Sequence, residues 1–193
     1  MIRLIVAIDR KRGIAKDGVQ PWKIPEDEQY FASQTKTHGG VVLIGSSTFK
    51  TFKGPLKDRQ NFVLTHAQEP IQGATLVHDL AQFLDKYQGK DLWVAGGASL
   101  YQQIIDANLA DELYITHIDA DFDCEQFFPD YEDKYTKIEE TTPHHQSGLS
   151  FTYAKYVRST HWVSLQINAS FDHRCYNLPP VKHKHKNNGN INV

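Results

Sequence analysis

The segment Ile2–Ile8 is the feature that most constrains the fold of this chain. It reads IRLIVAI, is nearly continuous in apolar residues, and is followed by the polar residues 9–13. A short run rich in β-branched side chains, with no polar face, is typical of a strand buried on both sides. The sequence therefore predicts a central strand of a sheet that is covered by helices on both faces.

Further segments extend this pattern along the chain. Short apolar runs predict strands at 41–44, 61–65, 74–77, 92–95 and 112–118. Helical spacing separates them, from Pro25 to about Lys36 and at 48–52, 80–87 and 99–107. After Ile118, residues 135–141 and 149–157 alternate like two antiparallel strands around a turn-rich segment, 142–148. We expect an α/β fold with a mostly parallel central sheet flanked by helices and a C-terminal antiparallel hairpin.

Composition excludes several classes of function. The 193 residues include 21 Lys plus Arg and 23 Asp plus Glu, a net charge of −2 that provides no broad basic surface for nucleic acid. The apolar runs are far shorter than the roughly 18 residues of a membrane helix, and no signal peptide is evident. The two cysteines, Cys124 and Cys175, have neither disulfide-framework nor metal-ligand spacing. We expect a cytoplasmic protein without a metal.

The composition changes after Arg158. Residues 159–193 show no sustained periodicity, hold four of the ten histidines, and end in a Lys/His cluster followed by Asn and Gly. Such a composition is typical of a solvated segment. The sequence predicts one domain over residues 1–158 and a C-terminal tail over 159–193 that is disordered or loosely docked.

Asp27 is the first candidate for chemistry. It lies at the predicted start of a helix, three residues after Ile24 and four before Phe31, so it shares a face with apolar side chains. A carboxylate on a buried face is costly unless it is paired. The residues alone leave two alternatives for Asp27, a structural ion pair and a ligand-binding group.

Two predicted strand-to-helix junctions are rich in small residues. Gly45-Ser46-Ser47-Thr48 follows one strand, and Gly96-Gly97-Ala98-Ser99 follows another. Free N–H groups at a helix start can bind phosphate, although an ordinary Ser/Thr cap explains the first segment equally well. Neither segment matches the GxGxxG or P-loop spacing. Two such junctions in one domain indicate a ligand with several phosphates.

These motifs occur together in one order. The chain has Pro21-Trp22 followed by Asp27 and Phe31, Ile44-Gly45 followed by Thr48, and Pro55-Leu56 followed by Arg59. It continues with Ala95-Gly96-Gly97 before Tyr101, and with Thr116-His117-Ile118 before Phe128-Pro129. In this respect the chain, over residues 1 to about 158, resembles the dihydrofolate reductases, and the bacterial enzymes most of all.

The resemblance implies a function and a substrate site. The expected reaction is reduction of 7,8-dihydrofolate to 5,6,7,8-tetrahydrofolate by hydride from NADPH, in a monomer that binds small molecules and is a target for antifolates. Asp27 would anchor the pterin through its two adjacent N–H donors, and Arg59 would clamp the glutamate tail, although a surface charge is the alternative for Arg59. Catalytic roles are implied for Trp22, Asp27 and Thr116. Substrate contacts are implied for Ile5, Ala7, Glu28, Phe31, Phe52, Leu56, Arg59, Ala95 and Tyr101.

The resemblance also implies a cofactor site, with departures. Many members carry an arginine where this chain has Ser46, and often a basic group near Ser99, so we expect weaker discrimination between NADPH and NADH. Ala15 stands where glycine is usual in the mobile loop 13–22, and Glu28 where an apolar residue is common. Cofactor contacts are implied for Ala7, Ile14, Ala15, Gly45, Ser46, Ser47, Thr48, Thr65, His66, Gly96, Gly97, Ala98, Ser99, Leu100, Tyr101 and Gln103.

Two other functions remain as alternatives. One is the related reductase of a riboflavin-pathway pyrimidine, which shares the sheet and the Gly-Gly junction. The segment from Pro21 to Phe31 and Arg59 argue against this reductase, because its substrate lacks a pterin ring and a glutamate tail. The other is a binding or scaffold protein on a decayed reductase fold, which the combination of Asp27, Thr116 and Arg59 opposes.

Overall fold

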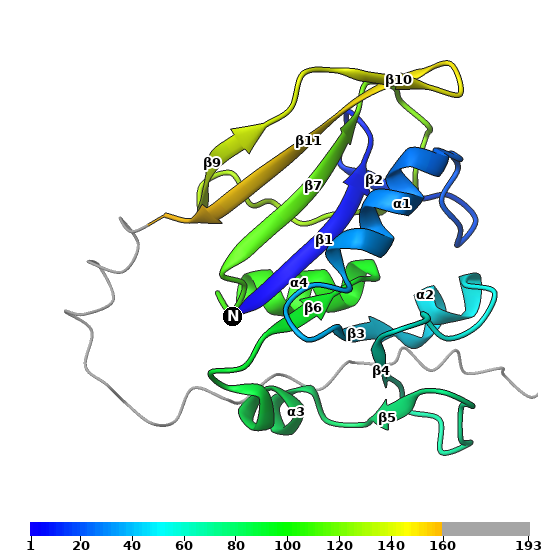
Figure 1. Ribbon diagram of the computed structural model, residues 1–193, viewed down its shortest axis with the longest axis vertical. Helices are drawn as coiled ribbons and strands as arrows, with labels where there is room; N and C mark the ends of the chain where they lie inside the picture. The colour runs from blue at the N-terminus through cyan, green and yellow to red at the C-terminus, as the bar shows by residue number, and fades with distance from the viewer. Residues whose placement is uncertain (160–193) are drawn as a thin grey trace, which may run out of the picture.

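A central sheet organises residues 1–159, which are the residues that the computed structural model describes (Figure 1). Its strands are β1 (Ile2–Ile8), β3 (Val41–Gly45), β4 (Gln60–Leu64), β5 (Thr75–Val77), β6 (Leu92–Val94), β7 (Glu112–Ile118), β9 (Tyr135–Glu140), β10 (His144–Gln146) and β11 (Leu149–Arg158). They lie in the order β10-β11-β7-β1-β6-β3-β4-β5, and β9 also pairs with β11. Strands from β7 across to β5 are parallel, whereas β9, β10 and β11 are antiparallel additions at one edge.

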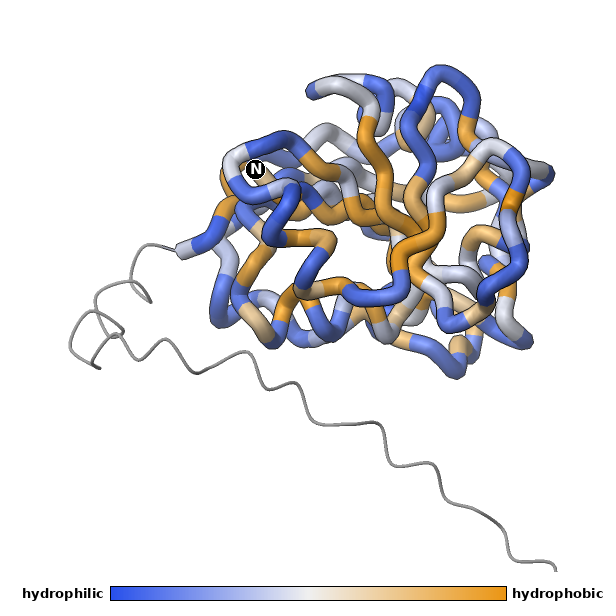
Figure 2. Tube along the Cα trace, turned by 90° about the horizontal axis from the view of Figure 1, so that it is seen from below, coloured by the Kyte–Doolittle hydropathy of each residue, from blue (hydrophilic) through white to orange (hydrophobic). Residues whose placement is uncertain are grey.

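Helices cover both faces of this sheet. They are α1 (Pro25–Gln34), α2 (Ser46–Thr51), α3 (Leu80–Tyr87) and α4 (Ala98–Asp106). Alternate residues of β1 enter different cores: Leu4, Val6 and Ile8 pack with α3 and α4, whereas Ile5 packs with side chains of α1 and α2. Figure 2 shows the apolar strand segments in the interior and hydrophilic segments around them. The apolar run IRLIVAI is therefore buried on both faces, as the sequence predicts.

The predicted fold class is confirmed, with the mostly parallel sheet, the flanking helices and the antiparallel C-terminal strands. The four predicted helices form with ends shifted by at most two residues, and the C-terminal pair is β9 and β11. Two details differ from the prediction. The turn-rich segment 142–148 contains β10, and β2 (Gly13–Ala15), after β1, pairs with β8 (Gln126–Phe127), after β7, in a small second sheet.

Three other expectations concern the cysteines, the tail and membrane helices. Cys124 is a buried free thiol, and burial raises its pKa to about 11. Cys175 and the predicted tail from residue 160 onward lie outside the described residues. No helix within residues 1–159 is long and apolar enough to cross a membrane.

Arg3 is the one charged residue within the apolar run of β1, and its side chain is only 5% exposed. Its Nη1 lies 2.6 Å from Asp91 Oδ1, and its Nε lies 2.9 Å from Glu112 Oε2 on β7. Lys155 of β11 pairs with the other oxygen of Glu112 at 2.9 Å. These ion pairs join β1, β7, β11 and the start of β6. The buried Arg3 guanidinium therefore stabilises the middle of the sheet.

Substitution of Arg3 tests this interpretation. We expect Arg3→Ala to lower the free energy of unfolding by about 3 kcal/mol, because two carboxylates lose a buried partner. Arg10→Ala is the control, since Arg10 forms an exposed pair with Asp119 and its loss should leave stability essentially unchanged. Urea unfolding followed by tryptophan fluorescence measures both. Equal stabilities of the two variants would contradict a role for Arg3 in holding the sheet.

Candidate active site

The carboxyl ends of the parallel strands meet at one edge of the sheet. Here Ala7 of β1 lies opposite Thr116 of β7, and Gly45 ends β3 beside the segment that follows β6. Open α/β sheets bind ligands at this edge, because the connecting loops and helix starts converge there. The fold therefore brings together predicted residues that are up to about 110 positions apart in the sequence.

Asp27 lies in the first turn of α1 and faces this edge. The hydroxyl of Thr116 donates a hydrogen bond of 2.6 Å to Asp27 Oδ1 and so joins the helix to β7. Burial raises the pKa of the Asp27 carboxyl to about 6, although the Thr116 bond opposes the shift. No cationic side chain of residues 1–159 pairs with it. The sequence left two alternatives for Asp27, a structural ion pair and a ligand-binding group. Within residues 1–159 Asp27 forms no ion pair.

Aromatic side chains form two pairs near the first turns of α1 and the segment before it. Trp22 packs against Phe122 with ring centroids 5.2 Å apart, and Tyr30 of α1 stacks on Tyr153 of β11 at 4.0 Å. Trp22 Nε1 and Tyr153 Oη are both buried, and neither has a hydrogen-bond partner among the described residues. Tyr153 lies close enough to Asp27 for the carboxylate to affect its pKa, and buried polar atoms without a protein partner can bind water or a polar ligand. Sequence analysis missed Tyr30, Phe122 and Tyr153, which the strand and helix patterns indicate only as core.

A second group of side chains extends from α1 toward the loop after α2. Phe31 and Phe52 lie with ring centroids 6.2 Å apart, and Leu56 packs in the same cluster. Arg59 donates from Nη1 to Thr35 Oγ1 at 2.7 Å and from Nε to the Lys57 carbonyl at 2.9 Å. These bonds fix the guanidinium beside the C-terminal end of α1, and the group remains partly exposed.

The two glycine-rich junctions touch one another. The N–H of Gly45 donates to the Gly96 carbonyl at 2.6 Å, and a Cβ added to Gly97 would lie 2.7 Å from Thr48 Oγ1. A cis peptide bond links Gly96 to Gly97. Neither α2 nor α4 has a side-chain cap at its start, so no side chain occupies the N–H groups there, although the Leu100 N–H of α4 is already bonded to the Gly97 carbonyl. Only glycine fits at 97 without displacing Thr48.

The remaining predicted cofactor residues differ in their exposure to solvent. Ser46 is half-buried, whereas Ser47, His66 and Ser99 are exposed. Ile14 and Ala15 are buried in β2, and the Ala15 carbonyl accepts a bond from the N–H of Glu125. Thr65 is buried next to His66 and accepts a bond from the N–H of Ala67.

Three predicted residues make contacts within the protein itself. Leu100 is 3% exposed, and its N–H is bonded to the Gly97 carbonyl, so its side chain belongs to the core. The buried hydroxyl of Tyr101 donates to the Ile5 carbonyl at 2.6 Å, and its ring lies against Gly96. Gln103 donates back to the Ser99 carbonyl.

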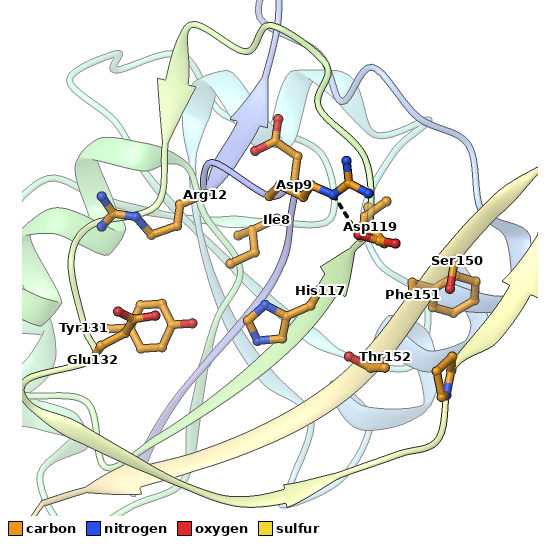
Figure 3. A pocket seen from close by; sticks show the side chains of 13 residues that line it. Ile8, Asp9, Arg12, His117, Asp119, Tyr131, Glu132, Ser150, Phe151 and Thr152 are labelled. Carbon is orange, nitrogen blue, oxygen red and sulfur yellow. Dashed lines mark hydrogen bonds and ion pairs between the residues drawn. The ribbon is translucent and has the colours of Figure 1, made fainter.

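A separate concavity of about 380 Å³ lies on the other face of β7 (Figure 3). His117 and Thr152 line it, whereas their neighbours Thr116 and Tyr153 point toward α1. Its walls mix Arg12 with Asp9 and Glu132, so no single ligand charge is favoured. No cluster of His, Cys, Asp and Glu within residues 1–159 is arranged to hold a metal ion.

Comparison with known proteins gives a consistent result. The family model for dihydrofolate reductase matches residues 1–158. The chain is 34% identical over 163 residues to the dihydrofolate reductase of Bacillus subtilis, covering 82% of this chain and 95% of that protein. It is 30% identical over 170 residues to the enzyme of Drosophila melanogaster, covering 78% of this chain and 93% of that protein.

A solved structure shows the same architecture. The dihydrofolate reductase from Enterococcus faecalis, complexed with NADP(H) and RAB-propyl, superposes with a TM-score of 0.72 at 26% sequence identity. The match covers 82% of this chain and 96% of that one. With the sequence motifs, the sheet and the family match in agreement, the chain belongs to the dihydrofolate reductase family.

Proposed function

We propose that this protein reduces 7,8-dihydrofolate to 5,6,7,8-tetrahydrofolate with NADPH. The observation that carries the proposal is the partly buried Asp27 carboxylate, 2.6 Å from the Thr116 hydroxyl and without a cationic partner in residues 1–159. Membership of the dihydrofolate reductase family and the names of the relatives support the same reaction.

Asp27 has the chemistry needed to hold the pterin. A carboxylate accepts two parallel hydrogen bonds from adjacent N–H donors, which the pterin ring presents. Thr116 donates to Oδ1 and so fixes the orientation of the acceptor. Since burial brings the carboxyl pKa to about 6, the group can favour protonation of the imine nitrogen N5 near neutral pH. Protonation at N5 makes C6 more electrophilic toward hydride. Ile5, Ala7 and Trp22, all buried, would exclude water from the reacting atoms.

NADPH would supply the hydride, and the residues at the sheet edge fit its phosphates. Gly45–Thr48 and Gly96–Ser99 present uncapped helix starts without bulky side chains, and the bond between Gly45 and Gly96 holds these junctions together. Ile14 and Ala15 would lie over the nicotinamide, with Thr65 and His66 near the adenosine phosphate. Because Ser46 and Ser99 carry no charge, the cradle relies on backbone N–H groups and hydroxyls.

The outer part of the site would hold the folate tail. Phe31, Phe52 and Leu56 form an apolar wall for the benzoyl group, and Arg59 would take the glutamate carboxylate in a bidentate pair. Exposed Glu28 would stand at the mouth, where its charge disfavours an acidic tail. We further propose that residues 1–158 form the complete catalytic domain and act as a monomer.

Removal of the Asp27 charge tests the reaction. We expect Asp27→Asn to lower kcat/KM for dihydrofolate by at least about 100-fold near pH 7, because the amide can neither pair with both N–H donors nor promote protonation at N5. Loss of reduced-nicotinamide absorbance measures turnover. Asp85→Asn, which removes an exposed carboxylate on α3, is the matched control. Absence of turnover in the wild-type protein would refute the proposed function, and equal activity of Asp27→Asn would refute the role of Asp27.

The raised pKa of Asp27 also predicts pH-dependent stability. Asp27 ionises near 3.8 in the unfolded chain and near 6 in the fold, so the unfolded state loses its proton first as the pH rises. The resulting cost to folding is absent below both values and complete above about pH 6. We expect Asp27→Asn to stabilise the ligand-free protein by about 3 kcal/mol at about pH 7.5, and by only about 0.5 kcal/mol at about pH 4. Urea unfolding at both pH values measures this. Equal gains at both would show that ionisation of Asp27 is not the cause.

Ser46 predicts the cofactor preference. We expect the wild-type protein to favour NADPH over NADH by less than about a thousandfold in kcat/KM, and Ser46→Arg to raise that ratio by about tenfold through a lower KM for NADPH. Thr51→Arg is the control, since it adds the same charge at the exposed opposite end of α2. Steady-state kinetics with both cofactors measures the ratios. A wild-type preference above about a thousandfold would contradict the interpretation of Ser46.

A further inference from the structure

Helix α1, which carries Asp27, begins without a cap from its own sequence. Its N-cap residue is Ile24, which makes no side-chain hydrogen bond, and Pro25 has no N–H to donate. The first free backbone donor is therefore the N–H of Glu26. It donates to Gln146 Oε1 at 2.7 Å, across 120 positions of sequence. A residue of β10 thus performs the function of the missing cap.

His144 adds a second contact between β10 and the same turn. Its Nδ1 lies 2.6 Å from Glu26 Oε1, and both side chains are about one-third exposed. The His144 ring also stacks on Phe151 with centroids 5.5 Å apart, and meets Tyr153 edge-on at 5.1 Å. Tyr153 in turn stacks on Tyr30, one helical turn after Asp27. The hairpin of β10 and β11 therefore contacts the start of α1 in three ways. It bonds to the backbone of Glu26, it bonds to the Glu26 side chain, and it stacks on Tyr30 through Tyr153.

These contacts converge on the residue next to Asp27. The bond from Thr116 fixes only one oxygen of the Asp27 side chain, while the direction of its Cα–Cβ bond depends on the backbone of the first helical turn. Gln146 and His144 hold that turn from the residue immediately before Asp27. Small displacements of a substrate-binding group have large effects on rate, because the reacting atoms must meet within a narrow range of geometry.

We propose that Gln146 and His144 are positioning residues that set the orientation of the Asp27 carboxylate toward the pterin. The inference rests on the proposed function, since it concerns the same site. Neither residue is among those assigned above to contact the substrate. They act through Glu26 and through the first turn of α1, so their loss should weaken the use of dihydrofolate and leave the binding of NADPH at α2 and α4 unchanged.

The experiment compares variants of β10 in the full-length protein. Gln146→Ala removes the acceptor, whereas Gln146→Glu keeps an oxygen at the same reach. His144→Phe keeps the aromatic stacking and removes the bond to Glu26. His145→Ala, at the exposed position between them, is the matched control. For each variant, kcat and the KM values for dihydrofolate and NADPH are measured, together with the melting temperature.

The proposal gives distinct expected results. Gln146→Ala should lower kcat/KM for dihydrofolate by about tenfold with the KM for NADPH unchanged, and Gln146→Glu should recover most of the loss. His144→Phe should lower it by a smaller factor, and this variant carries the test if Gln146→Ala does not fold. Kinetic constants of Gln146→Ala or His144→Phe equal to those of His145→Ala would overturn the proposal, as would parallel losses for both substrates. A wild-type protein without turnover would instead refute the proposed function.

Discussion

The burial of the parallel strands on both faces is the constraint on which the rest of the structure depends. Leu4, Val6 and Ile8 face one layer of helices, and Ile5 faces the other, so the middle of the sheet has no surface for a ligand. Polar chemistry is restricted to the edge where the strands end and helices begin. Asp27, Thr116 and the two glycine junctions all lie at that edge, although they come from four separate parts of the chain. The energetic cost of burying Asp27 is borne by the same packing that stabilises the sheet.

Elements with a local signal could be predicted from the sequence. The strands β1 and β7 and the helix α3 have the predicted bounds, because apolar runs and helical spacing are properties of neighbouring residues. The candidate site was also predictable in outline, since Asp27 and Phe31 share a helix face and Gly45 and Gly96 follow strands. The roles assigned to the site residues remain predictions.

Features that depend on distant contacts could not be predicted. Nothing near Gln146 indicates that its amide oxygen caps a helix 120 positions earlier, and the turn-rich composition of 142–148 concealed β10. Arg3 interrupts an apolar run, and only the folded sheet supplies Asp91 and Glu112 as its partners. Tyr153 follows the alternation of a buried strand, yet its hydroxyl lies beside the site. In each case the role of the residue depends on a neighbour that is close in space but distant in sequence, and local sequence propensity does not indicate it.

The place of β1 between β6 and β7 has a consequence for the order in which the chain can fold. Arg3 pairs in register with Trp93 of β6 and with Glu112 of β7, which lies 109 positions later in the sequence. During synthesis at about 5–20 residues per second, the apolar segment Ile2–Ile8 therefore has neither neighbour for on the order of 5 to 20 seconds. The central strand is the first to be made and among the last to be enclosed. Until then its apolar side chains are a surface for chaperones or for aggregation, so the segment that specifies the fold is also its main hazard during biosynthesis.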